Sequence, residues 1–216
     1  MPIIVPPIIY FKRMSKQQEV ISLSKRMCIM GILLFMVSAR TQTTMFKVDT
    51  TRNNLVQFHA NLTIGDFTAT TSNIEGQVRW EEPDTLATSE VNFRVDLASF
   101  DTGIGLRNTH MREKYLETDQ YPYAEYSGSL TEVTVISDSV LEMATSGIIK
   151  IHGVEQEFQT TVKAERWPAS FHVTDSFELN ISDYQIKQPR FLFTSMDRVV
   201  RVKLSFYVSR TSNVIH

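Results

Sequence analysis

The chain has very little cysteine: Cys28 is the only one among 216 residues. It lies within residues 1–39, which carry the marks of a segment that is removed on export. It also precedes the apolar run of that segment, where a lipoprotein cysteine would not be placed. Without it, the mature protein has no disulfide, no cysteine-ligated metal and no thiol chemistry. Its stability must therefore come from packing.

The chain also lacks a resident membrane helix, which requires about 20 consecutive apolar residues. The apolar run at residues 27–37, MCIMGILLFMV, is about half that length and follows Arg26. Residues 37–39, Val-Ser-Ala, offer small side chains where a signal peptidase cuts. A basic flank, a short apolar run and a small-residue site predict that residues 1–39 are an N-terminal extension and a secretory signal peptide. The alternatives are a short buried helix or an uncleaved anchor.

An excess of positive charge is absent. The whole chain has a net charge of −2, and without residues 1–39 it keeps 17 basic and 23 acidic residues, a net charge of −6. Phosphate binding requires concentrated positive charge. We therefore do not expect nucleic acid to be a partner.

Motifs of metal binding and catalysis are missing too. The histidines occur in no H-x-H or H-E-x-x-H pattern, so we expect no metal site; they are His59, His110, His152, His172 and His216. No G-x-S-x-G nucleophile elbow is present. We therefore expect a protein without catalytic residues or a cofactor, with a hydrolase as a minor alternative.

Alternation of apolar and polar residues fills most of the remaining chain. Strands with one buried face are predicted where this period of two persists: Val56–Ile64, Ile74–Trp80, Ser89–Leu97, Ala124–Leu130, Val140–Ile151, Phe158–Ala164, Phe171–Ile181 and Val200–Val208. Residues 65–73 are predicted to form a turn region. No repeat or change in composition marks a boundary, so we expect one domain over residues 45–210.

About eight antiparallel strands can form a sandwich or a closed barrel, and the pattern alone leaves this choice open. Several residues on the inward faces are small: Ala60, Gly76, Ala124, Gly128 and Gly147. They could leave room for a ligand. They could equally mark a close approach of two backbones or a bulge in a packed core.

One segment, Asp101–Pro122, interrupts the strands. Gly103 and Gly105 allow the chain to leave a strand sharply. The spacing of Leu106, His110 and Tyr115, with Met111 beside them, then predicts a short helix over residues 106–116 with one apolar face. A helix of three turns is marginal in water, so we expect it to lie on an apolar surface.

The same segment resembles a family signature. Residues 102–112, TGIGLRNTHMR, followed by Tyr121-Pro122, are similar to the motif T-G-x-x-x-R-[DN]-x-H-[LM]-R…[YF]-P of the YceI-like family. Residues 147–154, GIIKIHGV, and 177–186, FELNISDYQI, resemble two further motifs of that family. The resemblance covers nearly all of residues 45–210.

The resemblance implies an all-β protein: an antiparallel, eight-stranded, lipocalin-like barrel with a short helical insertion. It also implies an exported bacterial protein, periplasmic or secreted, that sequesters or transports a long-chain lipid. An isoprenoid, either a polyprenyl lipid or a quinone, would be the bound ligand, and no other cofactor is implied. Departures such as Asn108, where aspartate is common, and Gln185, where glycine is usual, leave the head group of the lipid open.

Within such a barrel the inward side chains would bind the lipid tail. The expected ligand-binding residues are Phe58, Val78, Trp80, Phe93, Val95, Met111, Tyr115, Phe177, Leu179, Val202 and Leu204. Arg107 and His110, with Asp183 nearby, would hold a polar head group. The alternative for each apolar residue is an ordinary place in the core, and for Arg107 a role in pinning the helix to the barrel rim.

Two other classes of function stay open at this stage. A ligand-free barrel could serve structure or adhesion in the cell envelope, because a fold does not establish a function. Transient contact with a membrane and assembly into a homodimer are further options that the sequence does not decide.

Overall fold

The structure, a computed structural model, describes residues 42–82, 86–191 and 194–211. The predicted signal peptide, residues 1–39, lies outside them. The strands are β1 (Gln42–Val48), β2 (Leu55–Leu62), β3 (Asp66–Thr71), β4 (Ile74–Glu82), β5 (Glu90–Asp96), β6 (Tyr123–Ser137), β7 (Val140–Ile151), β8 (Val154–Trp167), β9 (Ser170–Asn180), β10 (Arg190–Phe191) and β11 (Thr194–Arg210). The helical segments are η1 (Leu86–Thr88), η2 (Leu97–Ser99), α2 (Gly105–His110), η3 (Met111–Tyr115) and η4 (Ile181–Tyr184).

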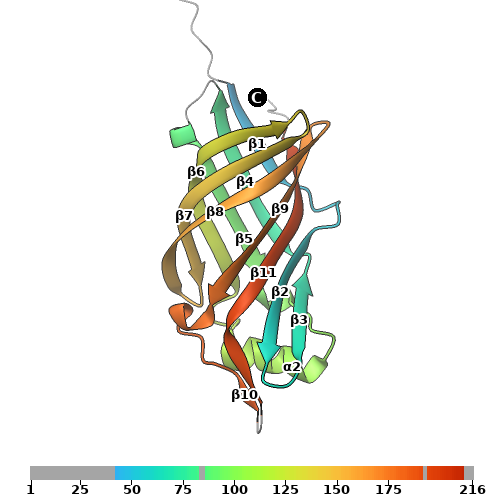
Figure 1. The fold of residues 1–216 in the computed structure, drawn as a ribbon, viewed down its shortest axis with the longest axis vertical. Coiled ribbons are helices and arrows are strands. Elements are labelled where there is room, and N and C mark those ends of the chain that lie inside the picture. Colours follow the sequence, from blue (N-terminus) through green and yellow to red (C-terminus); the bar gives the residue numbers. More distant parts are fainter. Residues whose placement is uncertain (1–41, 83–85, 192–193, 212–216) are drawn as a thin grey trace, which may run out of the picture. The chain divides into compact units, whose positions relative to one another are not determined.

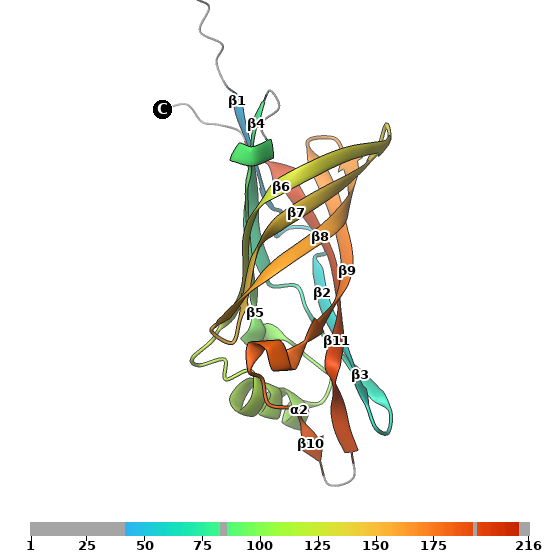
Figure 2. The same cartoon turned by 60° about the vertical axis from the view of Figure 1, so that its left-hand side comes forward.

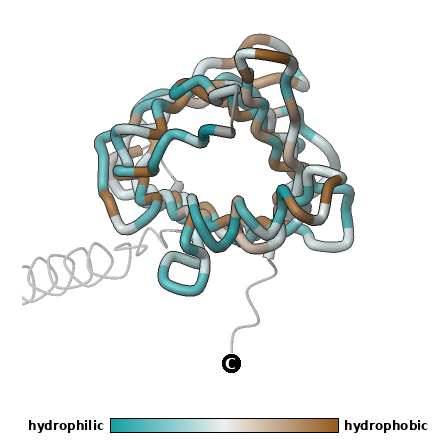
Figure 3. The backbone as a smooth tube through the Cα atoms, turned by 90° about the horizontal axis from the view of Figure 1, so that it is seen from below, coloured by the Kyte–Doolittle hydropathy of each residue, from teal (hydrophilic) through white to brown (hydrophobic). Residues whose placement is uncertain are grey.

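Eight of these strands close into an antiparallel barrel (Figures 1 and 2). The order around it is β1-β4-β5-β6-β7-β8-β9-β11, and β11 returns to pair with β1. Closure rests on three residue pairs, from Phe46 opposite Arg210 to Val48 opposite Val208. Viewed along its length, the backbone forms a ring (Figure 3). The prediction of an eight-stranded antiparallel barrel is confirmed, and the sandwich is ruled out.

The long strand β11 has two partners along the edge that closes the barrel. Its C-terminal end pairs with β1, and its N-terminal part pairs with β2, which in turn pairs with β3. The prediction of a turn region over residues 65–73 is wrong for β3, where Phe67, Ala69 and Thr71 form one buried or half-buried face. Ile64, predicted to end the inward face of a strand, instead lies in the β2–β3 turn with 74% of its surface exposed.

The predicted helix is present at the end of the barrel where β10 and the β2–β3 hairpin also lie (Figure 2). It begins as α2 and continues directly into one π-helical turn, η3. Met111 is 8% exposed and packs into the core, whereas Leu106 is 68% exposed. Leu106 was expected on the buried face. Met111, expected beside that face, is the buried residue of this segment.

The small inward glycines mark close approaches between backbones rather than empty space. Gly128 and Gly147 face each other across β6 and β7. A Cβ atom on either would lie closer than 3.0 Å to backbone atoms of the other strand. A Cβ on Gly76 would likewise meet the backbone of Asn92 and the ring of Phe93. At these three positions the glycine allows two backbones to approach closely, and it does not leave room for a ligand.

Candidate functional site

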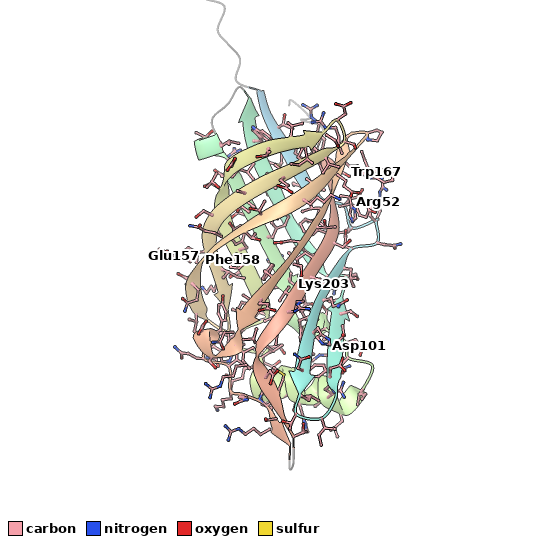
Figure 4. All side chains as sticks on the ribbon, in the orientation of Figure 1. Arg52, Asp101, Glu157, Phe158, Trp167 and Lys203 are labelled. Carbon is pink, nitrogen blue, oxygen red and sulfur yellow. The ribbon has the colours of Figure 1, made fainter. Side chains whose placement is uncertain are left out.

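The barrel encloses a cavity of about 620 Å³. Side chains from all eight barrel strands, from β2 and β3 and from α2 line it, and most of them are aliphatic or aromatic. Outward-facing neighbours are polar: Glu157 points away from the barrel, whereas Phe158 beside it lines the cavity (Figure 4). A cavity of this size and lining is typical of sites for apolar small molecules.

All thirteen residues predicted to bind a ligand line this cavity. They are Phe58, Val78, Trp80, Phe93, Val95, Arg107, His110, Met111, Tyr115, Phe177, Leu179, Val202 and Leu204. The sheet register brings some of them together, since Val202 pairs with Phe58 on β2 and with Phe177 on β9. Their contact with a ligand stays a prediction.

The interior packs as two apolar clusters. The first cluster includes Val56, Leu141, Val173, Phe206 and Val208, and the second includes Ala60, Ile149, Ile181, Met196 and Val200. Aromatic rings line both. Phe93 and Phe206 meet edge to face with ring centroids 5.1 Å apart, and Phe158 and Phe177 do so at 4.8 Å.

Four polar side chains lie at inward positions of neighbouring strands: Tyr126 on β6, Thr145 on β7, Thr160 on β8 and Asp175 on β9. We call them the polar belt. All four line the cavity, Tyr126 is hydrogen-bonded to Thr145, and Thr145 pairs with Thr160 across the sheet. Sequence reasoning missed this feature as a site. The sequence could have indicated it, because a polar residue stands where the alternation of the strand places an inward side chain. Asp175, between the inward residues Val173 and Phe177, is an example.

Asp175 is a carboxyl group inside an apolar barrel. Thr160 Oγ1 donates to its Oδ2 at 2.8 Å, and the backbone N–H of Ser176 donates to its Oδ1 at 2.7 Å. Burial raises the pKa of Asp175 above the ordinary value of 3.8, although both hydrogen bonds act in the opposite direction. The inward residues beside it on β8 and β11 include Val162, Val202 and Leu204, which carry no charge.

This raised pKa predicts a pH-dependent cost in stability. The folded protein binds the proton of Asp175 more tightly than the unfolded chain, so stability falls as pH rises above 3.8 through the folded pKa, and the loss is complete above that pKa. We expect Asp175→Asn to raise the free energy of unfolding at neutral pH by on the order of 1 kcal/mol, with a gain that shrinks toward about pH 4. Urea unfolding at several pH values measures it. Glu178→Gln, on the outer face of β9, is the control, and a gain independent of pH would contradict the assignment.

The lining of the cavity reaches the molecular surface beside α2. Ile104 and Leu106 line the cavity and are also strongly exposed. Arg107 stacks on the ring of Phe67, with its guanidinium carbon 4.7 Å from the ring centroid. Among the described residues, no hydrogen bond or ion pair joins Asp183 to Arg107 or His110, and the backbone carbonyl of Asp183 accepts from Gln156 Nε2 instead.

Arg107 joins α2 to β3 through its contact with Phe67, and Arg112 makes the bond to a backbone carbonyl. Its Nη2 donates to the backbone carbonyl of Phe100 at 3.1 Å. The segment after the helix is held from the other side by His152, whose Nε2 lies 2.9 Å from Glu117 Oε2 and whose Nδ1 lies 3.2 Å from the carbonyl of Tyr184. These contacts fix the helix end of the barrel, where Arg107 and His110 line the cavity.

Asn108 fastens the loop that leads into α2. Its Nδ2 donates to Asp101 Oδ1 at 2.6 Å, and its Oδ1 accepts from the backbone N–H of Thr102 at 2.9 Å. The first of these bonds is the main reason that the pKa of Asp101 lies below its ordinary value. Asp101 lies at the helix end of the barrel (Figure 4). An amide at position 108, rather than a carboxylate, is therefore matched to the carboxylate of Asp101.

We expect Asn108→Asp to lower the free energy of unfolding, because a carboxylate would replace the donor to Asp101. Chemical unfolding at neutral pH measures the change. Adding Asp101→Asn restores one amide and one carboxylate to the pair, so the double variant should recover most of the loss. A double variant as unstable as Asn108→Asp would show that the contact is not responsible.

Other kinds of site find no support in the described residues. Among residues 42–82, 86–191 and 194–211, no three histidine, cysteine or acidic side chains gather as a metal site requires. None of the described helices is long and apolar enough to cross a membrane.

Comparison with known proteins agrees with the fold. The family model described as YceI-like domain matches residues 46–208. Two solved structures are similar: BcnA of Burkholderia cenocepacia, with 15% identity and a TM-score of 0.60 over 74% of this chain and 98% of that one; and a polyisoprenoid-binding domain from Saccharophagus degradans implicated in plant cell wall breakdown, with 18% identity and a TM-score of 0.61 over 79% of this chain and 100% of that one. No curated protein matches the chain by sequence.

Proposed function

Because the chain belongs to the YceI-like family, we propose that it is a lipid-binding protein that holds an isoprenoid, a polyprenyl lipid or a quinone, or a similar long-chain apolar ligand inside its barrel. The observation that carries the proposal is the apolar cavity of about 620 Å³ lined from every barrel strand. The polyisoprenoid-binding domain with the same fold supports it.

Burial of the tail supplies the affinity. Each methylene-sized group removed from water contributes up to about 0.8 kcal/mol, so a tail of several isoprene units gains more than a few polar contacts can. The cavity offers aromatic and aliphatic walls for such a tail. Met111, which reaches the cavity from the helix end, has an unbranched and polarizable side chain that adapts to irregular ligands.

The opening suits the transfer of a lipid from a membrane. Ile104 and Leu106 expose apolar surface where the cavity opens, and exposed apolar residues at a rim are typical of a surface that meets a lipid phase. Transient membrane contact at this end is part of the proposal. Export to the periplasm or the exterior belongs to it as well, supported by the signal-like residues 1–39.

Binding is favoured over catalysis. A lining of this composition can hold a ligand but offers few groups that could transfer a proton or attack a bond. A ligand-free structural barrel is the main competitor. It would have the same fold and the same inward residues, and would differ only in retaining no lipid.

A transfer experiment tests the proposal. The protein is incubated with phosphatidylcholine vesicles that carry a small fraction of ubiquinone, the vesicles are removed by flotation, and the quinone left with the protein is measured by its absorbance. We expect close to one quinone per barrel. Protein that recovers no quinone, and no polyprenol in a parallel experiment, would favour the structural barrel.

The same experiment tests whether the lipid enters the cavity beside α2. Leu106→Glu places a charge on the exposed rim without entering the core, so we expect transfer to slow several-fold while the final occupancy stays the same. Glu178→Gln, on the outer face of β9, is the control. An unchanged transfer rate would mean that the lipid enters elsewhere.

A further inference from the structure

The polar belt lies between the two apolar clusters on β7, β8 and β9, while Phe58, Leu116 and Ala124 pack against both clusters. On β7 the inward residue Met143 packs with the first cluster and Ile149 with the second, and Thr145 lies between them. The same order holds on β8, where Thr160 lies between Val162 and Phe158. On β9, Asp175 follows Val173 of the first cluster and precedes Leu179 of the second. A lipid that occupies the length of the cavity would pass this belt.

Two members of the belt are already paired. Tyr126 and Thr145 are hydrogen-bonded to each other through their hydroxyl groups. Asp175 is different, because a carboxylate offers about four acceptor positions, and hydrogen bonds from the described residues occupy two of them, one from Thr160 and one from Ser176. No described cationic side chain forms an ion pair with it. Asp175 therefore presents unused acceptor capacity to the cavity.

A wholly apolar chain would fit this position poorly. Covering a carboxyl group with hydrocarbon removes water from it without supplying a hydrogen bond, and that desolvation is unfavourable. A ligand with a donor at this point would compensate for the loss. Sites built around a hydrogen bond reject analogues that lack the matching group, because the buried protein group is then left unpaired.

We propose that Asp175, positioned by Thr160, is a polar subsite inside the lipid cavity that selects chains carrying a hydrogen-bond donor, a hydroxyl or a protonated amine. This subsite rests on the proposed lipid-binding function and names the class of lipid that it favours. Its chemistry is distinct from that of Arg107 and His110, since a carboxylate accepts hydrogen bonds whereas a guanidinium only donates them. Hydrocarbons, ethers and oxidised quinones carry no donor, so they would bind in the cavity without the contribution of this subsite.

Three isoprenoids with the same C20 chain test the subsite: geranylgeraniol, its methyl ether and geranylgeranylamine. Their affinities are measured by displacement of a fluorescent lipid from the full protein. We expect the alcohol and the amine to bind about tenfold or more tightly than the ether. In Asp175→Leu this preference should fall to within about twofold, because the acceptor is gone. Glu178→Leu, a carboxylate lost from the outer face of the same strand, should keep the full preference.

Asp175→Asn distinguishes binding of the alcohol from binding of the amine. It also provides a second test in case Asp175→Leu does not fold. It keeps an acceptor oxygen and loses the charge, so the preference for the alcohol should persist while that for the amine falls. If the wild type binds the ether as tightly as the alcohol, or if Asp175→Leu keeps the preference, the subsite is wrong although lipid binding stands. If none of the three compounds binds, the proposed function fails together with the subsite.

Discussion

Phe93→Asp is expected to abolish lipid retention. Phe93 lines the cavity from β5 and packs edge to face on Phe206. An aspartate there removes this aromatic surface and places a carboxylate between Val91 and Val95, opposite Tyr126, whose hydroxyl is already hydrogen-bonded to Thr145. A lipid tail would have to cover that charge at a cost of about 3 kcal/mol or more, which corresponds to a loss in affinity of about a hundredfold. Lipid extracted from the purified variant measures the effect.

Two further variants make this result interpretable. Asn92→Asp adds the same carboxylate on the outer face of β5 and should retain lipid as the wild type does. Val202→Trp fills the cavity with an apolar ring, so it should also lose lipid without burying a charge. Circular dichroism and thermal unfolding establish that each variant is folded. A folded Phe93→Asp protein that keeps its lipid would show that the cavity is not the binding site.

Gly147→Ala is expected to have the largest effect on stability. A Cβ at this position would lie closer than 3.0 Å to the carbonyl oxygen of Ser127 and to the Cα of Gly128, both of them backbone atoms. The two strands would have to separate, so we expect the free energy of unfolding to fall by about 1–3 kcal/mol. Urea denaturation of the two proteins measures the difference.

The matched control is Gly105→Ala. No atom lies within 4 Å of a Cβ built on Gly105, which is the first residue of α2. Alanine is favoured over glycine in a helix, so this substitution should leave stability unchanged or raise it by up to about 1 kcal/mol. If Gly147→Ala is as stable as Gly105→Ala, the two backbones are not in the tight contact described.

The strands could be predicted because each buries one face, and this leaves a period of two in the sequence. Closure of the barrel could not be predicted from that pattern. It depends on Phe46–Val48 of β1 pairing with the far end of β11, about 160 residues away. The strand β3 was missed because its threonines and Asp66 are also typical of turns. Its pairing with β2, which its own composition does not encode, makes it a strand.

The apolar lining of the cavity could be predicted for the same reason as the strands. The contacts of the polar residues at the site could not be predicted from the sequence. The sequence shows Arg107 and Arg112 as similar residues of one motif, and only the structure assigns the bond to Phe100 to Arg112 and the stacking on Phe67 to Arg107. Asp175 interrupts an apolar face of the sequence pattern. Its role as a polar group inside the cavity depends on the hydrogen bond from Thr160 on the neighbouring strand, which the sequence does not show.

Native mass spectrometry of the protein, purified without detergent, tests the central claim most directly. The spectrum gives the mass of any bound molecule and the oligomeric state together, and organic extraction then identifies what is released. We predict a stoichiometric adduct with the mass of an isoprenoid or of a lipid with a similarly long chain. A clean mass of the protein alone, unchanged after incubation with quinones and polyprenyl lipids, would contradict the account.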